Sequence, residues 1–317
     1  MPDIPDAALS QVRVGICILN YHQPEATLAC IRRLLEVEGP ETRILWLEND
    51  FDTTQGDIIG FLECSGLSWT RIDPEKDDLP GSGGIAFVPI PRNLGYAAGN
   101  NVGLRYLHRL GIEYAWVMNN DTWLMKGSSR ELQREADHNP DVGIWGTCIR
   151  TEHDQTYYGG IVQLKDFSIT YANDPRDLAE SERCFISGCS MFVRTKTAQE
   201  AGWIPDDYFL YYEDPAFSLE MRKIGKSLGY CPSVEIRHDE SLSIGRRSSL
   251  MEFYNRRNRW LFIQRYFPEH LTIQLCRRWY CYQKLFFRAK FRRMTIEHFA
   301  LKDYCDGLKG PTHRSFS

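Results

Sequence analysis

The segment Ile112-Glu-Tyr-Ala-Trp-Val-Met-Asn-Asn-Asp121 changes abruptly from apolar and aromatic residues to two amides and a carboxylate. Its apolar part is typical of a buried central strand in a parallel sheet. Such sheets bind ligands beyond the carboxyl ends of their strands. We therefore expect Asn119, Asn120 and Asp121 to meet a ligand. Their oxygen atoms suit hard cations and the phosphate groups that such cations accompany.

Strands and helices alternate along the chain up to this segment. Apolar runs at residues 12–19 and 43–47 predict buried strands, and Pro24 opens a helix through about residue 35. A short strand at 85–88 leads into PRNLGYAAGNNVGLRYLHRLG, whose second half has helical spacing and stops at Gly111. This alternation predicts an α/β fold with a parallel sheet covered by helices on both faces.

The pattern loosens after residue 121. The remaining elements that we expect are strands at 143–147, 157–162, 168–171, 184–194 and 227–236, and a helix at 215–224. No apolar stretch reaches the roughly 18 residues that a membrane span needs.

Composition is that of an ordinary globular protein. The 317 residues are 43% hydrophobic and 25% charged, and they suffice for one large α/β domain with an appendage or for two domains. The ten cysteines include no CxxC pair, and no secretory leader precedes them. We therefore expect reduced thiols in a cytoplasmic protein and no zinc site.

The net charge of −4 conceals a basic region at residues 246–293. That region holds 13 Lys/Arg and two acidic residues, whereas the remainder holds 25 Lys/Arg and 40 Asp/Glu. Arginines alternate there with aromatic residues, which suits an amphipathic helix at an anionic membrane surface. A helical subdomain packed on the core is the alternative, and both descriptions can hold together. Nucleic-acid binding would also use these charges, but no recognised motif supports it.

Four polar clusters follow strands or open helices, and each has an ordinary structural explanation when taken alone. Residues 48–50 could form a turn, Asn93 and Gly95 could enter a helix, and a lone His238 is most often structural. Asp214 precedes Pro215 and is expected to cap a helix. The apolar run at residues 208–212 would also place this carboxylate where burial tunes it as a base.

In this order and spacing, four segments resemble signature segments of the family 2 glycosyltransferases of the GT-A fold, and within them the rhamnosyltransferase-like branch. The segments are NLGYAAGNNVGL, MNNDTWL, YFLYYEDPAFSLEMRKIG and HDESLSIG, and the resemblance covers residues 12–265. It implies a GT-A type, Rossmann-like, mostly parallel sheet flanked by helices. The catalytic domain would span residues 1–245, and a basic aromatic helical region would span residues 246–317.

The resemblance also implies residue roles. Asp121 matches the last acid of the DxD motif, which holds Mg²⁺ or Mn²⁺ against the donor diphosphate, and His238 matches a later ligand of the same ion or diphosphate. Asp214 matches the general base, with Glu213 beside it. Positions that line the nucleotide and sugar pocket are matched by Asn20, Glu48, Asn93, Gly95, Asn100, Asn119 and Asn120. The chain departs from the motif at Asn119, where an amide replaces the first acid and removes one charge.

These matches lead us to expect an inverting, metal-dependent transferase. The branch implies transfer of L-rhamnose from dTDP-L-rhamnose to a lipid-linked precursor of a cell-surface polysaccharide, such as O-antigen or cell wall, at the inner face of the cell membrane. A UDP-galactofuranose or UDP-hexose donor is the alternative within the fold. A non-catalytic nucleotide-sugar or glycan-binding module is the alternative outside enzymes, although the joint presence of Asp121, Glu213, Asp214 and His238 argues against it.

Overall fold

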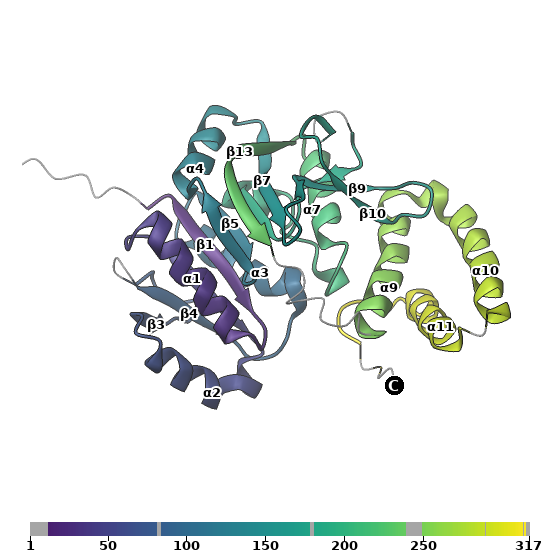
Figure 1. Ribbon diagram of the computed structural model, residues 1–317, viewed down its shortest axis with the longest axis horizontal. Coiled ribbons are helices and arrows are strands. Elements are labelled where there is room, and N and C mark those ends of the chain that lie inside the picture. Colours follow the sequence, from purple (N-terminus) through teal and green to yellow (C-terminus); the bar gives the residue numbers. More distant parts are fainter. Residues whose placement is uncertain are drawn as a thin grey trace, which may run out of the picture.

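A ten-stranded sheet forms the centre of the molecule, in the order β3-β4-β2-β1-β5-β12-β7-β13-β6, with β8 paired to β7 (Figure 1). The computed structural model describes residues 12–80, 84–177, 181–238, 249–288, 290–312 and 314. Strands β3, β4, β2, β1 and β5 run parallel, as predicted for all of them except β3, which was not expected, whereas β12 is antiparallel to both β5 and β7. The sheet strands are β1 Val14–Asn20, β2 Ile44–Asn49, β3 Trp69–Arg71, β4 Ile85–Ile90, β5 Tyr114–Asn119, β6 Thr122–Lys126, β7 Val142–Thr151, β8 Thr156–Tyr157, β12 Ser190–Arg194 and β13 Ser227–His238.

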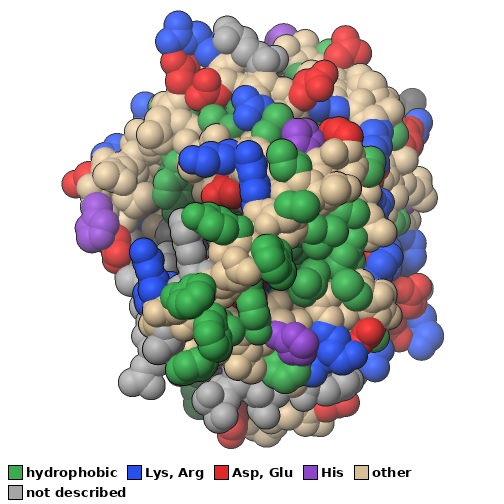
Figure 2. Space-filling view, turned by 90° about the vertical axis from the view of Figure 1, so that its right-hand side faces the viewer, with side chains coloured by type: hydrophobic (Ala, Val, Ile, Leu, Met, Phe, Trp, Pro, Cys, Tyr) green, Lys and Arg blue, Asp and Glu red, His purple; other side chains and the backbone are tan. Residues whose placement is uncertain are grey.

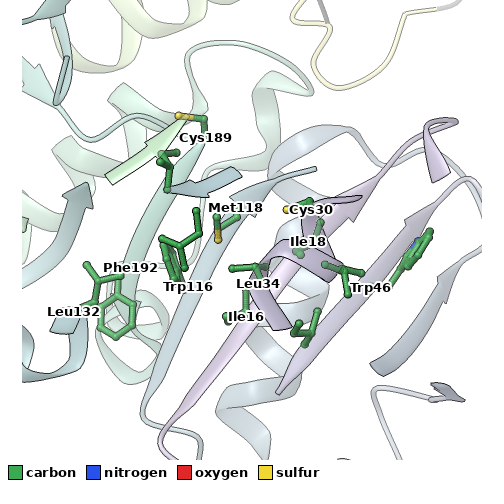
Figure 3. Close-up of a cluster of buried hydrophobic side chains, with 14 of the residues drawn as sticks. Ile16, Ile18, Cys30, Leu34, Trp46, Trp116, Met118, Leu132, Cys189 and Phe192 are labelled. Atoms are coloured by element: carbon green, nitrogen blue, oxygen red, sulfur yellow. The ribbon is translucent and has the colours of Figure 1, made fainter. Parts of the chain in front are cut away.

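Helices cover both faces of this sheet because side chains alternate between the faces along each strand. Ile16 and Ile18 of β1 pack with α1 and α2, whereas Cys17 between them faces the α3 side. Figure 3 shows the first of these clusters, with Leu34 of α1 lying over Ile16. The helices of this part are α1 Pro24–Glu38, α2 Phe51–Cys64, α3 Gly95–Arg109, α4 Ser129–His138, α6 Thr195–Glu200, the short 3₁₀ helix η1 Asp206–Tyr208 and α7 Glu213–Lys223.

A small antiparallel sheet corrects one expectation. The predicted strand at 184–194 is divided into β11 Cys184–Phe185, which joins β9 Gly159–Val162 and β10 Ile169–Ala172, and β12, which joins the large sheet. The chain leaves the ladder between them because the N–H of Gly188 is directed to Asp214 instead of to a strand. The predicted strand at 157–162 is likewise divided, between β8 and β9.

The predicted helix cap at Asp214 was wrong. Helix α7 begins at Glu213, its N-cap is Tyr212 with φ 74°, and Asp214 lies within the first turn. Pro215 misled the prediction because proline is tolerated throughout the first turn, where backbone N–H groups have no helical partner. Strand β6 and helix α4 were not predicted at all.

The C-terminal region folds into helices α9 Ser249–Tyr266, η2 Pro268–His270, α10 Leu271–Phe287 and α11 Phe291–Cys305. Residues Trp260 to Ile263 of α9 share a buried cluster with Tyr208 and Tyr212, so α9 packs on the core. Helix α10 is different, because Trp279 is 67% exposed and Phe287 is 85% exposed. On this end of the molecule hydrophobic side chains gather, with Lys and Arg around them (Figure 2). The expected boundary at 245/246 lies outside the described residues.

Candidate active site

The carboxyl ends of β1 and β2 hold a fully buried amide and carboxylate. Asn20 Nδ2 donates to Glu48 Oε2 at 2.7 Å, and Trp46 Nε1 donates to the same oxygen at 2.9 Å. Thr54 Oγ1 donates to the other carboxylate oxygen at 3.0 Å. These three donors fix the orientation of Glu48, as a buried carboxylate requires.

The same amide joins β1 to the turn after β5. Asn20 Oδ1 accepts from Thr27 Oγ1 at 2.8 Å and from Asn120 Nδ2 at 3.4 Å, and Asn120 Nδ2 also donates to Thr27 Oγ1 at 3.0 Å. Three residues expected in the donor pocket, Asn20, Glu48 and Asn120, therefore lie in one network. Their assembly follows from parallel strands ending at one edge of the sheet.

A second amide network positions the start of α3. Asn49 Nδ2 donates to Asn93 Oδ1 at 3.1 Å, and Asn93 Oδ1 also accepts from the N–H of Gly95 at 2.8 Å. Gly95 has φ 82°, and a Cβ there would lie 2.3 Å from the carbonyl oxygen of Phe209. Only glycine permits this approach. One turn later, Asn100 Nδ2 donates to the carbonyl of Tyr96, and Asn100 Oδ1 is buried without a hydrogen-bond partner among the described residues.

Asp121, in the turn between β5 and β6, faces His238 at the end of the neighbouring strand β13. Asp121 is 1% exposed, and its Oδ1 lies 3.3 Å from His238 Nε2. The other ring nitrogen of His238 lies 3.4 Å from the hydroxyl of Tyr157. Asn119 ends β5, where its N–H donates to the carbonyl of Cys189 at 3.1 Å.

The two carboxyls at the start of α7 are shielded from water. Glu213 is 6% exposed, and its Oε2 has no hydrogen-bond partner among the described residues. Burial raises the pKa of Asp214 to about 7, although the Gly188 N–H, 3.1 Å from Oδ2, opposes this. Burial and then the charge of Asp214 raise the pKa of Glu213 to about 8. Near neutral pH, one carboxyl of the pair can therefore ionise while the other keeps its proton.

The loop between β11 and β12 lies between the Glu213–Asp214 pair and the Asp121–His238 pair, and the sequence did not reveal its role. Its Gly188 donates to Asp214, and the carbonyl of Gly188 accepts from the hydroxyl of Tyr96. Burial, followed by the charge of Glu213 and smaller effects that include Asp214 and Asp121, raises the pKa of Tyr96 well above its ordinary value. Tyr96 therefore lies within electrostatic reach of both acidic groups. The sequence signal that could have identified Tyr96 as a site residue was its position within the motif NLGYAAGNN.

Helix α9 holds the segment that precedes the carboxyl pair. Asn258 Nδ2 lies 2.7, 2.6 and 3.1 Å from the carbonyl oxygens of Tyr208, Leu210 and Tyr211. Phe209, Tyr211 and Tyr212 have φ values of 69°, 70° and 74°, which are rare for bulky side chains. Such conformations persist where the surroundings over-determine them. The amide of Asn258 supplies one such constraint.

Asp121 and His238 could hold a divalent cation only together with a bound diphosphate, which would supply further ligands. Among the residues with described positions, no three His, Cys, Asp or Glu side chains converge on a common metal position. Mg²⁺ is commonly bound by one or two protein ligands together with substrate phosphates. A buried carboxylate beside an imidazole fits that mode, with the remaining coordination left to a diphosphate and water.

The model of the glycosyl transferase family group 2 matches residues 116–298, which begin within β5, include the carboxyl pair and end within α11. This chain belongs to that family. Among curated proteins, this chain is 24% identical over 184 residues to the low-salt glycan biosynthesis hexosyltransferase Agl10 of Haloferax volcanii. The match covers 56% of this chain and 59% of the relative, so this chain spans less than two thirds of that protein's length.

Two solved structures share the fold of this chain. The mannosyltransferase PcManGT from Pyrobaculum calidifontis, in complex with GDP-Man and Mn²⁺, matches with TM-score 0.51 and 13% identity over 93% of this chain and 75% of its own. GalNAc-T7 with UDP, GalNAc and Mn²⁺ matches with TM-score 0.52 and 8% identity over 72% of this chain and 44% of its own. This chain therefore has the expected GT-A architecture, a mostly parallel sheet flanked by helices.

Proposed function

We propose that this protein transfers a sugar from a nucleotide-sugar donor to a hydroxyl acceptor with inversion at the anomeric carbon. The observation that carries the proposal is that the loop between β11 and β12 contacts Asp214 on one side and the end of β5, next to Asp121, on the other. Gly188 contacts Asp214, and the adjacent Cys189 contacts the N–H of Asn119, two residues before Asp121. Asp214 suits a catalytic base, and Asp121 suits the binding of a diphosphate with its cation.

Asp214 takes the role of the base. The acceptor oxygen attacks the anomeric carbon, the bond from that carbon to the donor diphosphate breaks, and the hydroxyl proton passes to a carboxylate oxygen of Asp214. Positioned bases of this kind contribute about 10²- to 10⁴-fold in rate. Glu213, with its higher pKa, stays protonated beside it. Tyr96 and Gly188 hold Asp214 in place.

The donor diphosphate lies against Asp121 and His238 in this proposal. A bound Mg²⁺ or Mn²⁺ would neutralise negative charge on the leaving diphosphate. The Mn²⁺ present with PcManGT and GalNAc-T7 supports this cofactor. Asn20, Glu48, Asn93, Gly95, Asn100, Asn119 and Asn120 are assigned to the nucleotide and sugar pocket. Support comes from the hydrogen bonds that join Asn20, Glu48 and Asn120 and those that join Asn93 to Gly95.

For the donor we propose dTDP-L-rhamnose, on the resemblance of the sequence motifs to the rhamnosyltransferase-like branch. The relative from Haloferax volcanii is a hexosyltransferase, and the two solved structures contain UDP with GalNAc and GDP-Man. A UDP-galactofuranose or UDP-hexose donor therefore remains the alternative to be tested beside it.

For the acceptor we propose a lipid-linked saccharide, which would bring the protein to the inner face of the cell membrane. The support is the outer surface of α10, where Leu275, Trp279, Tyr282 and Phe286 recur at helical spacing and are all exposed. Apolar rings with flanking arginines suit the membrane interface. No helix in the described parts of the chain is long and apolar enough to cross a bilayer.

A donor panel tests the proposal. Purified protein with Mn²⁺ is incubated with dTDP-L-rhamnose, UDP-galactofuranose, UDP-glucose or GDP-mannose, and thermal stabilisation and nucleoside-diphosphate release are measured. We expect one donor to stabilise the fold and to release its nucleotide. Binding without release, unchanged by Asp214→Asn and by added lipid-linked acceptors, would instead indicate a non-catalytic binding module. No binding of any donor would overturn the proposal.

A further inference from the structure

A cavity of about 310 Å³ lies away from the carboxyl pair, between α9, α10 and the turn that joins β9 to β10. Helix α10 is held against this turn by Gln274, whose Nε2 donates to the carbonyl oxygens of Leu164 and Lys165 at 3.3 and 3.0 Å. The lining includes Lys165, Arg256, Arg259, Trp260, Arg277 and Tyr280. The cavity thus combines cations with aromatic rings.

The cationic side chains of the cavity outnumber its acidic ones. Arg256 and Arg278 are neutralised in part by Glu297 of α11, and Asp166 also lines the cavity. Arg259 and Arg277 form no ion pair within the described residues. Arg277 donates to the carbonyl of Lys165, and Arg259 Nε is buried without a hydrogen-bond partner among those residues.

This set of donors matches a phosphate group. A guanidinium offers several N–H groups in a fixed plane and binds phosphate oxygens in pairs. Arg259 of α9 donates to the carbonyl of Asp166 and to Asn255, and Arg277 of α10 donates to Lys165, so neither has an acidic partner in the described part of the chain. A phosphate or diphosphate in the cavity would supply a counter-charge to both and an acceptor to Arg259 Nε. A buried N–H without a partner, such as Arg259 Nε, is costly unless a ligand or water accepts its hydrogen bond.

The surroundings favour an amphiphilic ligand. Trp260, Ile263 and Tyr280 supply apolar area inside the cavity, and Tyr280 also belongs to the exposed aromatic surface of α10. That surface lies on the same face of the molecule as the exposed cations (Figure 2). A phosphate in the cavity could therefore carry an alkyl chain along α10 without burying a charge in lipid.

One hydrogen bond joins the wall of the cavity to the segment that carries the carboxyl pair. Asp166 in its wall precedes Phe167, whose carbonyl accepts from the hydroxyl of Tyr212 at 2.6 Å, and Tyr212 directly precedes Glu213. A saccharide attached to a phosphate in the cavity would thus begin beside the segment that carries the base.

We propose that this cavity binds the phosphate group of the lipid carrier that bears the acceptor saccharide. The proposal rests on the function proposed above and assigns its acceptor a site. Arg259 and Arg277 bind the phosphate, Trp260 and Tyr280 contact the first part of the alkyl chain, and the outer face of α10 meets the membrane.

Binding of farnesyl diphosphate, a soluble amphiphile with the required group, tests this site. Affinity is measured in EDTA, which removes metal-dependent binding at Asp121, for the wild-type protein and for Arg277→Gln, Arg259→Gln and Arg288→Gln. We expect Arg277→Gln and Arg259→Gln each to weaken binding by about tenfold or more, because each loses a charge-assisted contact. Arg288→Gln removes the same charge beside α10 and should stay within about twofold, because Arg288 is exposed and does not line the cavity.

Donor binding with Mn²⁺ serves as the internal control and should be unchanged in all three variants, so that failure here is distinct from failure of the proposed function. Arg277 is exposed, so its replacement leaves the core intact. Farnesol should bind far more weakly than farnesyl diphosphate. Wild-type affinity in both cavity variants, or equal losses in Arg288→Gln, would overturn the proposal. Displacement of farnesyl diphosphate by phosphatidylglycerol vesicles would also overturn it, by assigning the cavity to bulk lipid headgroups.

Discussion

His238 Nε2 lies 3.3 Å from Asp121 Oδ1, so that the end of β13 meets the turn after β5. The strands are brought together because β13 pairs with both β6 and β7, and β6 begins one residue after Asp121. Two residues far apart in sequence therefore form one buried polar pair. We assign the donor diphosphate and its cation to this pair.

Asp121→Ala should abolish the part of donor binding that depends on the metal. The variant removes the carboxylate and leaves His238 as the single side-chain ligand of the pair. Titration calorimetry with the preferred donor should show at least about tenfold weaker binding with Mn²⁺. In EDTA the variant and the wild-type protein should bind alike. Equal affinity of the two proteins in Mn²⁺ would remove Asp121 from the metal site.

Asn258→Ala should slow sugar transfer without changing the affinity for the donor. The amide restrains three carbonyl groups of the segment before Glu213, and its loss frees backbone with left-handed φ values. Leaving buried carbonyls without their donor costs about 1–3 kcal/mol of stability. Well below the melting temperature we expect kcat to fall about tenfold, while donor affinity stays unchanged.

Asn255→Ala provides the matched control for Asn258→Ala. Asn255 lies on the same helix and is half-buried, and within the described part of the chain its side chain hydrogen-bonds only to Arg259, at 3.4 Å. Its replacement should leave kcat unchanged. The positioning role of Asn258 would be refuted if the two variants turned over at the same rate.

Gly95→Ala should destabilise the fold more than Gly111→Ala. Both glycines have positive φ, at 82° and 71°, so alanine costs roughly 1–2 kcal/mol at each. At Gly95 the added Cβ also meets the Phe209 carbonyl at 2.3 Å, whereas at Gly111 it meets nothing within 4 Å. Urea unfolding should therefore show the larger loss for Gly95→Ala. Equal losses would mean that the α3 and Phe209 backbones adjust freely.

The sequence predicted the central strands because their apolar runs are long and their carboxyl ends are polar. The family resemblance, and not the strand pattern, assigned Asn20, Glu48 and Asn120 to one pocket, and hydrogen bonds join these three side chains. Asp214 was expected as a helix cap but lies inside the first turn, because the backbone of Tyr212 adopts a left-handed conformation that no local pattern signals.

The parts of the site that escaped prediction depend on contacts between distant segments. Gly188 and Asp214 come from different elements. Neither the interruption between β11 and β12 nor the contact of Gly188 with Asp214 leaves a periodic pattern in the sequence. The amide of Asn258 acts on carbonyl groups some fifty residues earlier in the chain. Backbone acceptors are present at every residue, so the sequence gives no sign of which ones a buried amide will bind.

Transfer should accelerate as pH rises toward neutrality. Burial holds the pKa of Asp214 at about 7, and the base must be ionised to accept a proton. The acceptor kcat/KM should therefore increase about tenfold per pH unit well below pH 7 and level off above it. Glu213→Gln should keep this rising limb, because Glu213 has the higher pKa, keeps its proton over that pH range, and is replaced by an equally uncharged side chain. A flat profile from pH 5.5 to 8 would exclude Asp214 as the titrating base.

The most direct test of the account compares the wild-type protein with Asp214→Asn in donor binding and sugar transfer. The amide keeps the size of the side chain and can still accept from the Gly188 N–H, so the fold and the donor site should be preserved. We predict unchanged donor affinity by calorimetry and a fall in kcat of about 10²- to 10⁴-fold. Transfer at the wild-type rate by a folded, donor-binding Asp214→Asn protein would contradict the account.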